Sequence, residues 1–175
     1  DVFRQEPLDG KLWPFLMLDA TYFKVREGHK VTSNAMMVAM GYTAEGRREL
    51  LGFNVYDNES NPTWFDFLVD LKNRGLHGTL MITSDAHPAI LNAITKVFPG
   101  VPWQRCQFHF MRNILDVTPT KEQAGLAIEL REMFSSRTLK EATQRKQEIQ
   151  KDYGSIAPHA VDILEQGFED TMTVM

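Results

Sequence analysis

The periodicity of the chain changes near residue 57, and this change limits the folds that the chain can adopt. Before it, Trp13–Val25, Val31–Tyr42 and Arg48–Tyr56 are rich in aromatic, branched and methionine residues, as strands are. The turns between these segments are short, at Glu27–Lys30 and Thr43–Gly46. Short connections favour antiparallel pairing, so this part of the chain predicts a three-stranded meander.

Beyond residue 57, helical and strand-like segments alternate. A proline and a polar cap at Asn61–Thr63 predict a helix start, and Gly75 marks its end. Short apolar runs predict buried strands, and longer amphipathic runs predict helices. The expected strands are Thr79–Thr83 and Val101–Cys106, and the expected helices are Pro88–Phe98 and Phe108–Val117. A meander followed by β-α-β units predicts an α/β fold with a mixed sheet and flanking helices. The ribonuclease H-like fold has this order, although other α/β folds with an initial meander would give the same pattern.

The composition shifts after Thr118–Thr120. Residues 121–151 are helix formers of alternating charge, Gly154 and Pro158 interrupt them, and a later helix runs to about Phe168. The sequence therefore predicts two parts: an α/β core over residues 1–118 and an all-helical segment over residues 119–175.

Composition narrows the possible classes of function. With 43% apolar and 24% charged residues among 175, the chain is typical of a globular protein, not of a disordered tail or a coiled coil. No run of apolar residues is long enough to predict a membrane span, and Asp1–Arg4 does not begin a signal peptide. The single cysteine, Cys106, fits a reducing compartment. Because the chain starts with Asp, we expect it to be a piece of a longer protein.

Net charge bears on nucleic-acid binding. A net charge of −4 argues against a dedicated DNA-binding module, since such modules are usually basic. It leaves open an enzyme core that meets DNA through a local patch.

Two aspartates are the main candidates for chemistry. Asp19 lies within an apolar strand, where a charge is costly unless it is paired or binds a metal, or is hydrogen-bonded to neighbouring amides. Asp85 follows a buried strand and precedes a helix, a position that suits a ligand-binding residue and equally a helix N-cap. Together they could hold Mg²⁺ or Mn²⁺ for phosphodiester chemistry, with a third carboxylate to complete the site.

Other residues have a structural and a functional interpretation. Asp66 and Asp70 fit the solvated face of their helix, although ribonuclease H proper carries a catalytic carboxylate there, which keeps Asp66 a candidate. Cys106 and His109 have the spacing of half a zinc site, but the other half is not evident. They are alternatively a buried cysteine and a capping histidine, or a histidine near the carboxylates. Trp64 and Trp103 fit a hydrophobic core better than base stacking.

Several segments carry a resemblance to a known family: Leu18–Tyr22 with Lys24–Arg26, Gly46–Gly52, Trp64 to Leu71, Ser84–His87, Val97–Gly100 and Trp103–Asn113. The last of them, Trp103–Asn113, is long and specific, and the match spans about residues 15–117. In their order and spacing, these segments resemble the Mutator-type transposases of bacterial insertion sequences.

The resemblance implies a ribonuclease H-like DDE catalytic core, incomplete over residues 1–118, followed by part of an all-helical insertion over residues 119–175. Asp19 and Asp85 match the first two catalytic, metal-binding residues, with Mg²⁺ or Mn²⁺ as cofactor. Cys106 and His109 match an element near the active site. The family's third catalytic residue, a Glu on a later helix, has no match here, since Glu165 and Glu169 lie in the wrong context. It is expected beyond Met175, which would leave the chain inactive alone. We also expect Cys106, His109, Arg112 and His87 near the active site or in contact with DNA.

The resemblance also implies the reaction and the partners. The parent protein would be a DNA transposase that cleaves phosphodiester bonds and transfers strands, acting on transposon ends and target DNA as a homo-oligomer. It would work in the bacterial cytoplasm, associated with the nucleoid and not with a membrane. The alternatives are a domesticated or catalytically incomplete module that binds DNA or a partner, and a ribonuclease H-like metal-dependent nuclease.

Overall fold

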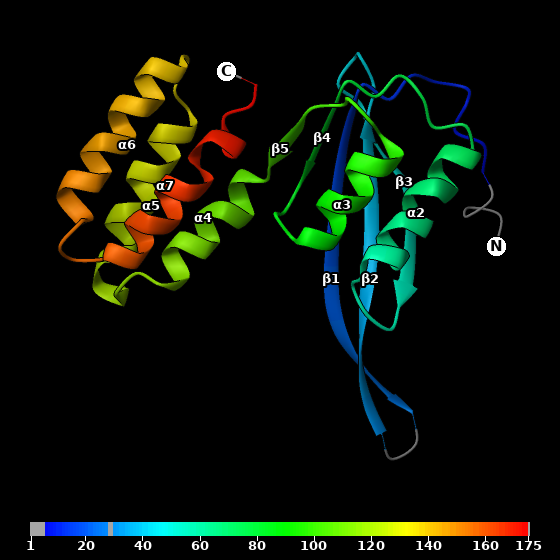
Figure 1. Cartoon of the computed structure of the whole chain (residues 1–175), viewed down its shortest axis with the longest axis horizontal. Coiled ribbons are helices and arrows are strands. Elements are labelled where there is room, and N and C mark those ends of the chain that lie inside the picture. The colour runs from blue at the N-terminus through cyan, green and yellow to red at the C-terminus, as the bar shows by residue number, and fades with distance from the viewer. Residues whose placement is uncertain (1–5, 28–29, 175) are drawn as a thin grey trace. The chain divides into compact units, whose positions relative to one another are not determined.

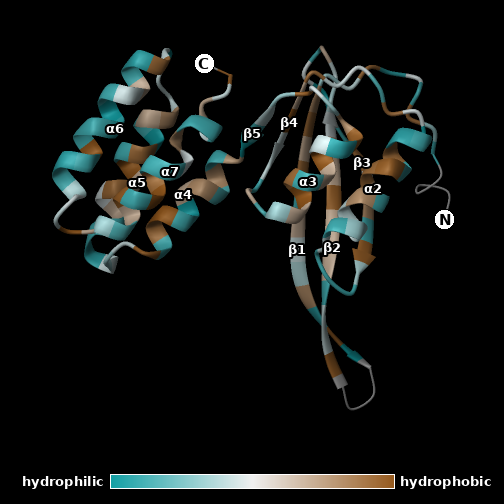
Figure 2. Ribbon diagram, viewed as in Figure 1, coloured by the Kyte–Doolittle hydropathy of each residue, from teal (hydrophilic) through white to brown (hydrophobic). Residues whose placement is uncertain are grey.

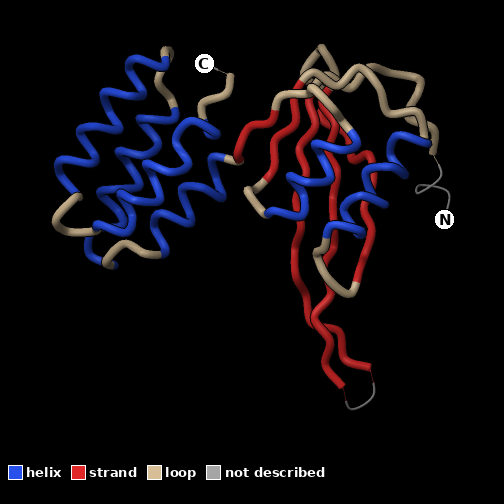
Figure 3. Tube along the Cα trace, in the orientation of Figure 1, coloured by secondary structure: helices blue, strands red, loops and turns tan. Residues whose placement is uncertain are grey.

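The strand-rich first segment forms three strands of a five-stranded sheet in the computed structural model, which describes residues 6–27 and 30–174 (Figures 1 and 3). β1 (Phe15–Glu27) pairs antiparallel with β2 (Lys30–Tyr42), and β2 pairs antiparallel with β3 (Arg48–Tyr56). The predicted meander is therefore confirmed. The resulting sheet has a hydrophobic face, which must be buried against other elements of the fold.

The alternating segment supplies the other strands and the helices of the first unit. β4 (Met81–Ser84) lies parallel to β1, and β5 (Trp103–Arg105) completes the order β3-β2-β1-β4-β5. This order, with an antiparallel meander followed by parallel strands, is the ribonuclease H-like arrangement that the sequence predicts. The helices between the strands are α2 (Asn61–Asn73) and α3 (Pro88–Val97).

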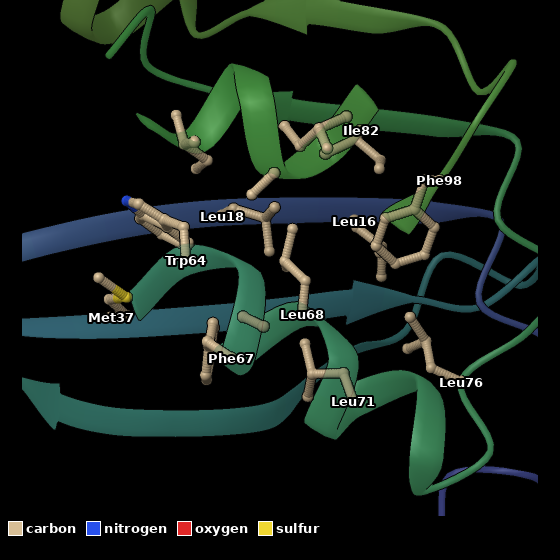
Figure 4. Close-up of a cluster of buried hydrophobic side chains, with 14 of the residues drawn as sticks. Leu16, Leu18, Met37, Trp64, Phe67, Leu68, Leu71, Leu76, Ile82 and Phe98 are labelled. Atoms are coloured by element: carbon tan, nitrogen blue, oxygen red, sulfur yellow. The ribbon is translucent and has the colours of Figure 1, made fainter. Parts of the chain in front are cut away.

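A capping box explains where α2 begins. Ser60 is the N-cap, and the hydroxyl of Thr63 accepts a hydrogen bond from the Ser60 amide at 2.9 Å. The apolar spacing of the helix then turns four side chains towards the sheet, where they pack with residues of β1, β2, β4 and α3 (Figure 4). The four are Trp64, Phe67, Leu68 and Leu71, all buried, and Trp64 is therefore a core residue as expected.

The second unit is helical. It contains α4 (Gln107–Asp116), α5 (Thr120–Phe134), α6 (Leu139–Tyr153) and α7 (Pro158–Thr171). Each of these helices carries both hydrophilic and hydrophobic residues (Figure 2). Their apolar sides meet in a separate buried cluster around Phe110, Leu130 and Leu164.

The chain divides into compact units at a different place from the composition boundary. The units are Asp1–Trp103 and Gln104–Met175, whereas the sequence predicts a boundary between residues 118 and 119. α4 accounts for the difference, because Phe110 and Ile114 are buried in the helical cluster. The shift in composition marks the start of helix-rich sequence, not the first helix of the second unit.

Candidate functional site

The register of the sheet relates the two candidate aspartates. β1 and β4 run parallel, and their last registered pair is Met17 with Thr83. Asp19 and Asp85 each lie two positions further on, so the same register, continued just past the end of β4, sets them opposite each other. Neighbouring strands are about 4.8 Å apart, which is close enough for two carboxylates to share a ligand. This is the carboxyl end of β4, the edge at which α/β sheets bind ligands.

Each aspartate has a local hydrogen bond that orients it. Oδ1 of Asp19 accepts from the amide of Ala20 at 2.9 Å, in the middle of β1 and not at its end. Oδ1 of Asp85 accepts from the amide of His87 at 3.2 Å. Both side chains are half-buried. Asp85 is not the N-cap of α3, because that position belongs to His87. The structural alternative for Asp85 is therefore wrong in its simplest form.

The loop that carries Asp85 is fixed from its other side by Trp103. The indole Nε1 of Trp103 donates to Oγ of Ser84 at 2.9 Å, and that hydroxyl donates to the carbonyl oxygen of Asp85 at 2.7 Å. Trp103 also packs against the core of the first unit, as expected. A tryptophan and a buried serine thus hold the main chain of Asp85 in place.

A third carboxylate, which the sequence did not single out, lies beside this loop. Glu59 precedes the N-cap of α2, and only 4% of its side chain is exposed. Its Oε1 accepts from Nε1 of Trp64 at 2.8 Å, and its Oε2 accepts from the hydroxyl of Tyr22 at 2.9 Å. A carboxylate is buried at acceptable cost only when such donors surround it. Glu59 therefore links α2 to β1.

Glu59 also reaches the Asp85 loop through His87. Nδ1 of His87 lies 3.4 Å from Oε1 of Glu59 and 3.3 Å from the amide nitrogen of Ala89. One ring nitrogen cannot accept from an amide and donate to a carboxylate at the same time. The contact with Ala89 therefore requires Nδ1 without a proton, and a hydrogen bond to Glu59 requires a proton on Nδ1.

The pKa of Tyr22 responds to both Glu59 and Asp85. Loss of solvent around the phenol, its hydrogen bond to Glu59 and the negative charges of Glu59 and Asp85 all raise its pKa above the usual value. The ionised tyrosine would add a third negative charge to this region. Tyr22, Glu59 and Asp85 come from β1, from the loop before α2 and from the end of β4.

The remaining candidates lie on α2 and in the helical unit. Asp66 is exposed on α2, away from the buried side of the helix. In the helical unit, Cys106 is a buried free cysteine at the N-cap of α4, and His109 is half-buried within that helix. Arg112 is exposed and lies 3.8 Å from Asp116. Among the described residues, no group of three or more His, Cys, Asp and Glu side chains is placed to hold a metal ion.

The sequence of the whole chain, residues 1–175, matches the family model described as "Transposase, Mutator family". The chain belongs to the Mutator family of transposases. Within residues 6–27 and 30–174, no helix has the length and apolar character that a membrane span requires.

Curated relatives of this Mutator-family chain are insertion-sequence transposases. The IS256 transposase of transposon Tn4001 from Staphylococcus aureus is 39% identical over 165 residues, which are 93% of this chain and 42% of the relative. The IS1081 transposase from Mycobacterium tuberculosis is 41% identical over 119 residues, which are 68% of this chain and 29% of the relative. The chain therefore spans less than half the length of these relatives.

Two solved structures are more distantly similar. The Drosophila P element transposase strand transfer complex is 13% identical with a TM-score of 0.40, and the match covers 97% of this chain and 52% of that one. The catalytic core domain of HTLV-2 integrase in complex with magnesium is 14% identical with a TM-score of 0.32, covering 67% and 85%. The fold of the Mutator-family chain is assigned from its own strand order and register.

Proposed function

We propose that Asp19 and Asp85 are two of the acidic residues of a DDE transposase active site that cleaves DNA and joins the cut end to a target. The observation that supports the proposal is the parallel register of β1 and β4, whose last pair, Met17 with Thr83, lies two positions before each aspartate. Membership of the Mutator family supports DNA as the substrate. We expect residues 1–118 to act as the catalytic core, residues 119–175 as a helical insertion, and the complete protein to act as an oligomer.

The donor set fits a hard divalent cation. Mg²⁺ and Mn²⁺ prefer oxygen ligands, and both candidates are carboxylates at the end of one strand and in the middle of its neighbour. When bound, such a cation polarises a phosphoryl oxygen and lowers the pKa of the attacking hydroxyl or water. The described residues contain no group of three suitable ligands, so a third acidic residue remains to be identified in the complete protein.

The residues around the aspartates prepare them for this task. The amide of His87 holds one oxygen of Asp85, and Ser84 with Trp103 holds its main chain. Glu59 ties β1 and α2 together beside the same loop. Side chains fixed in this way lose little entropy when they bind, so the protein can hold a reacting phosphate in one geometry.

Neutral substitution of the aspartates tests the proposal. We expect Asp19→Asn or Asp85→Asn to abolish DNA cleavage by the full-length transposase that contains this chain. In the 175-residue chain, either change should weaken Mn²⁺ binding by about tenfold or more, measured by electron paramagnetic resonance of the free ion. Asp66→Asn is the matched control, since it removes one exposed carboxylate from α2. Normal cleavage by either aspartate variant would refute the assignment.

A non-catalytic DNA-binding module is the second candidate, favoured by the lack of a three-ligand group among the described residues. It predicts that the full-length protein binds DNA but leaves it uncut at every Mg²⁺ or Mn²⁺ concentration. Cleavage that depends on both Asp19 and Asp85 would exclude it.

A further inference from the structure

The β1–β2 hairpin continues well beyond the rest of the sheet. The two strands pair from Phe15 with Tyr42 to Glu27 with Lys30. β3 joins β2 only from Ala35 onward, and β4 joins β1 only as far as Met17. The outer part, which we call the arm (residues 21–27 and 30–34), is thus a two-stranded ribbon that extends past α2 and α3 (Figures 1 and 3). Such a ribbon is marginally stable by itself, so its length needs a reason.

The charge of the arm differs in sign from that of the rest of the chain. Residues 21–34 contain three basic residues and one acidic residue, a net charge of +2. The remainder contains sixteen basic against twenty-two acidic residues. A positive arm on a negative protein is complementary to a polyanion and would be the first part to meet one.

One face of the arm presents its basic side chains in a row. Tyr22, Lys24 and Arg26 alternate along β1 on the same face, and all three are exposed. Their cross-strand partners, Ala35, Ser33 and Val31, are uncharged, so no acid on the opposite strand neutralises the row. The α-carbons of Lys24 and Arg26 are about 6.7 Å apart at strand spacing, which is close to two phosphate steps along the axis of one DNA strand.

One strand of the arm is the continuation of β1, the strand that contains Asp19. Lys24 and Arg26 lie five and seven residues beyond Asp19 in β1, which is about 17 and 24 Å along the strand. Because five and seven are odd, the side chains of Lys24 and Arg26 leave β1 on the face opposite to that of Asp19. DNA with one phosphate at Asp19 and Asp85 would therefore reach them around the edge of the arm, not along one face. A two-stranded ribbon is also narrow enough to enter the major groove of B-form DNA.

We propose that the arm is a DNA-binding surface, with Lys24 and Arg26 contacting the phosphate backbone next to the site of cleavage. The proposal rests on the proposed function, because it takes DNA at Asp19 and Asp85 as its point of origin. Phosphate contacts position a duplex without reading its sequence, so the arm would set the register of DNA on the active site.

The salt dependence of DNA binding tests the arm. Fluorescence anisotropy would follow a labelled mixed-sequence duplex titrated with the 175-residue chain between about 50 and 200 mM salt. We expect the double substitution Lys24→Gln and Arg26→Gln to make the slope of log affinity against log salt shallower by about 1.8, from two lost phosphate contacts. The matched control is Arg47→Gln with Arg48→Gln, two exposed arginines near the start of β3. This control removes the same charge and should change the slope by less than about 0.5.

Three results would overturn the proposal. One is an equal change of slope in both double variants, which would make the effect one of net charge. Another is no binding to the duplex at about 50 mM salt, where phosphate contacts are strongest. The third is a dimer, seen by sedimentation, that the arm variant alone dissociates while its DNA slope stays unchanged. Mn²⁺ binding by the arm variant should match that of the parent chain, so failure of the arm is distinguishable from failure of the metal site.

Discussion

Glu59 of the α/β unit is held differently from the paired acids of the helical unit. In the helical unit, the paired acids lie on the surface: Glu132, Glu141 and Glu165 have 54%, 46% and 56% of their side chains exposed, and each faces a lysine or arginine. In the α/β unit, Glu59 is 4% exposed, and its hydrogen-bond donors are neutral side chains, Tyr22 and Trp64. Exposed ion pairs contribute little to stability, whereas a buried carboxylate must be held by specific donors.

This contrast indicates which of the two units is the better candidate for an active site. In the helical unit, the paired acids Glu132, Glu141 and Glu165 lie outside the apolar cluster around Phe110 and Leu164. In the α/β unit, the buried Glu59 contacts the core residue Trp64 and lies beside His87, two residues after Asp85. A carboxylate held next to a core is costly, and such a cost is characteristic of functional sites.

The prediction with the largest expected effect asks whether the two units unfold independently of each other. Leu68→Ala in α2 and Leu130→Ala in α5 make the same change at fully buried positions. Each should lower the free energy of unfolding by about 2–5 kcal/mol, because it removes buried methyl groups and leaves a cavity. Hydrogen exchange read by mass spectrometry should show the loss of protection mainly in the unit that carries the substitution. An equal loss in both units would break the comparison and mean that the chain unfolds as one body.

Substitution of either of two glycines in the helical unit by alanine should change the free energy of unfolding by a smaller amount. A β-carbon at Gly167 in α7 would lie 2.5 Å from Cε2 of the buried Phe110, whereas at Gly125 in α5 it would meet only the hydroxyl of Tyr153 at 3.0 Å. Gly167→Ala should therefore destabilise by about 1–3 kcal/mol through overpacking. Gly125→Ala should be neutral or stabilise by up to about 1 kcal/mol, since alanine is the better helix former. Denaturant unfolding of the two variants measures both. Similar values would show that the helical cluster is looser than its contacts indicate.

Removal of the buried carboxylate sharpens the comparison directly. Glu59→Ala leaves the indole N–H of Trp64 without its acceptor in a buried place, so we expect a loss of about 1–3 kcal/mol. Glu59→Gln keeps an acceptor for that donor and should cost less than about 1 kcal/mol. Glu132→Ala, which removes an exposed acid of the helical unit, is the control and should cost no more than about 1 kcal/mol. If Glu59→Ala and Glu132→Ala lower the free energy of unfolding by the same amount, the buried carboxylate contributes no more to stability than an exposed one.

The sequence predicts the fold better than the site. Period, turn length and caps identify the strands and helices within a few residues, because these signals are local: β2 is predicted at Val31–Tyr42 and observed at Lys30–Tyr42. The positions of Asp19 and Asp85 follow from the strands that carry them, although no pattern in the sequence gives their register. Residues 121–151 read as helix-forming throughout, and only the cap at Thr138, whose hydroxyl accepts from the amide of Glu141 at 3.2 Å, marks where α6 begins anew.

Glu59 shows why part of the site could not be predicted. In sequence it stands between Asn58 and Ser60, in a polar stretch that reads as an ordinary loop. Its burial comes from Trp64, one turn into α2, and from Tyr22, which is 37 positions away along the chain. Contacts at such separations depend on the tertiary fold, so no local pattern indicates that this acid differs from its neighbours.

The smallest effect concerns the titration of Tyr22. Its pKa is raised by loss of solvent and by the hydrogen bond and charge of Glu59, so the folded state favours the protonated phenol. The resulting stabilisation is fully present below the unfolded pKa of about 10 and is lost as the pH rises through the higher folded value. Ultraviolet absorbance of the phenolate, taken as the difference between the parent chain and Tyr22→Phe, should therefore show ionisation above the usual pH. In a Glu59→Gln background the same difference should move towards lower pH, because the negative charge next to the phenol is gone. An unchanged titration would mean that Glu59 does not control the electrostatics beside Asp85, and the contrast between the two units would then rest on burial alone.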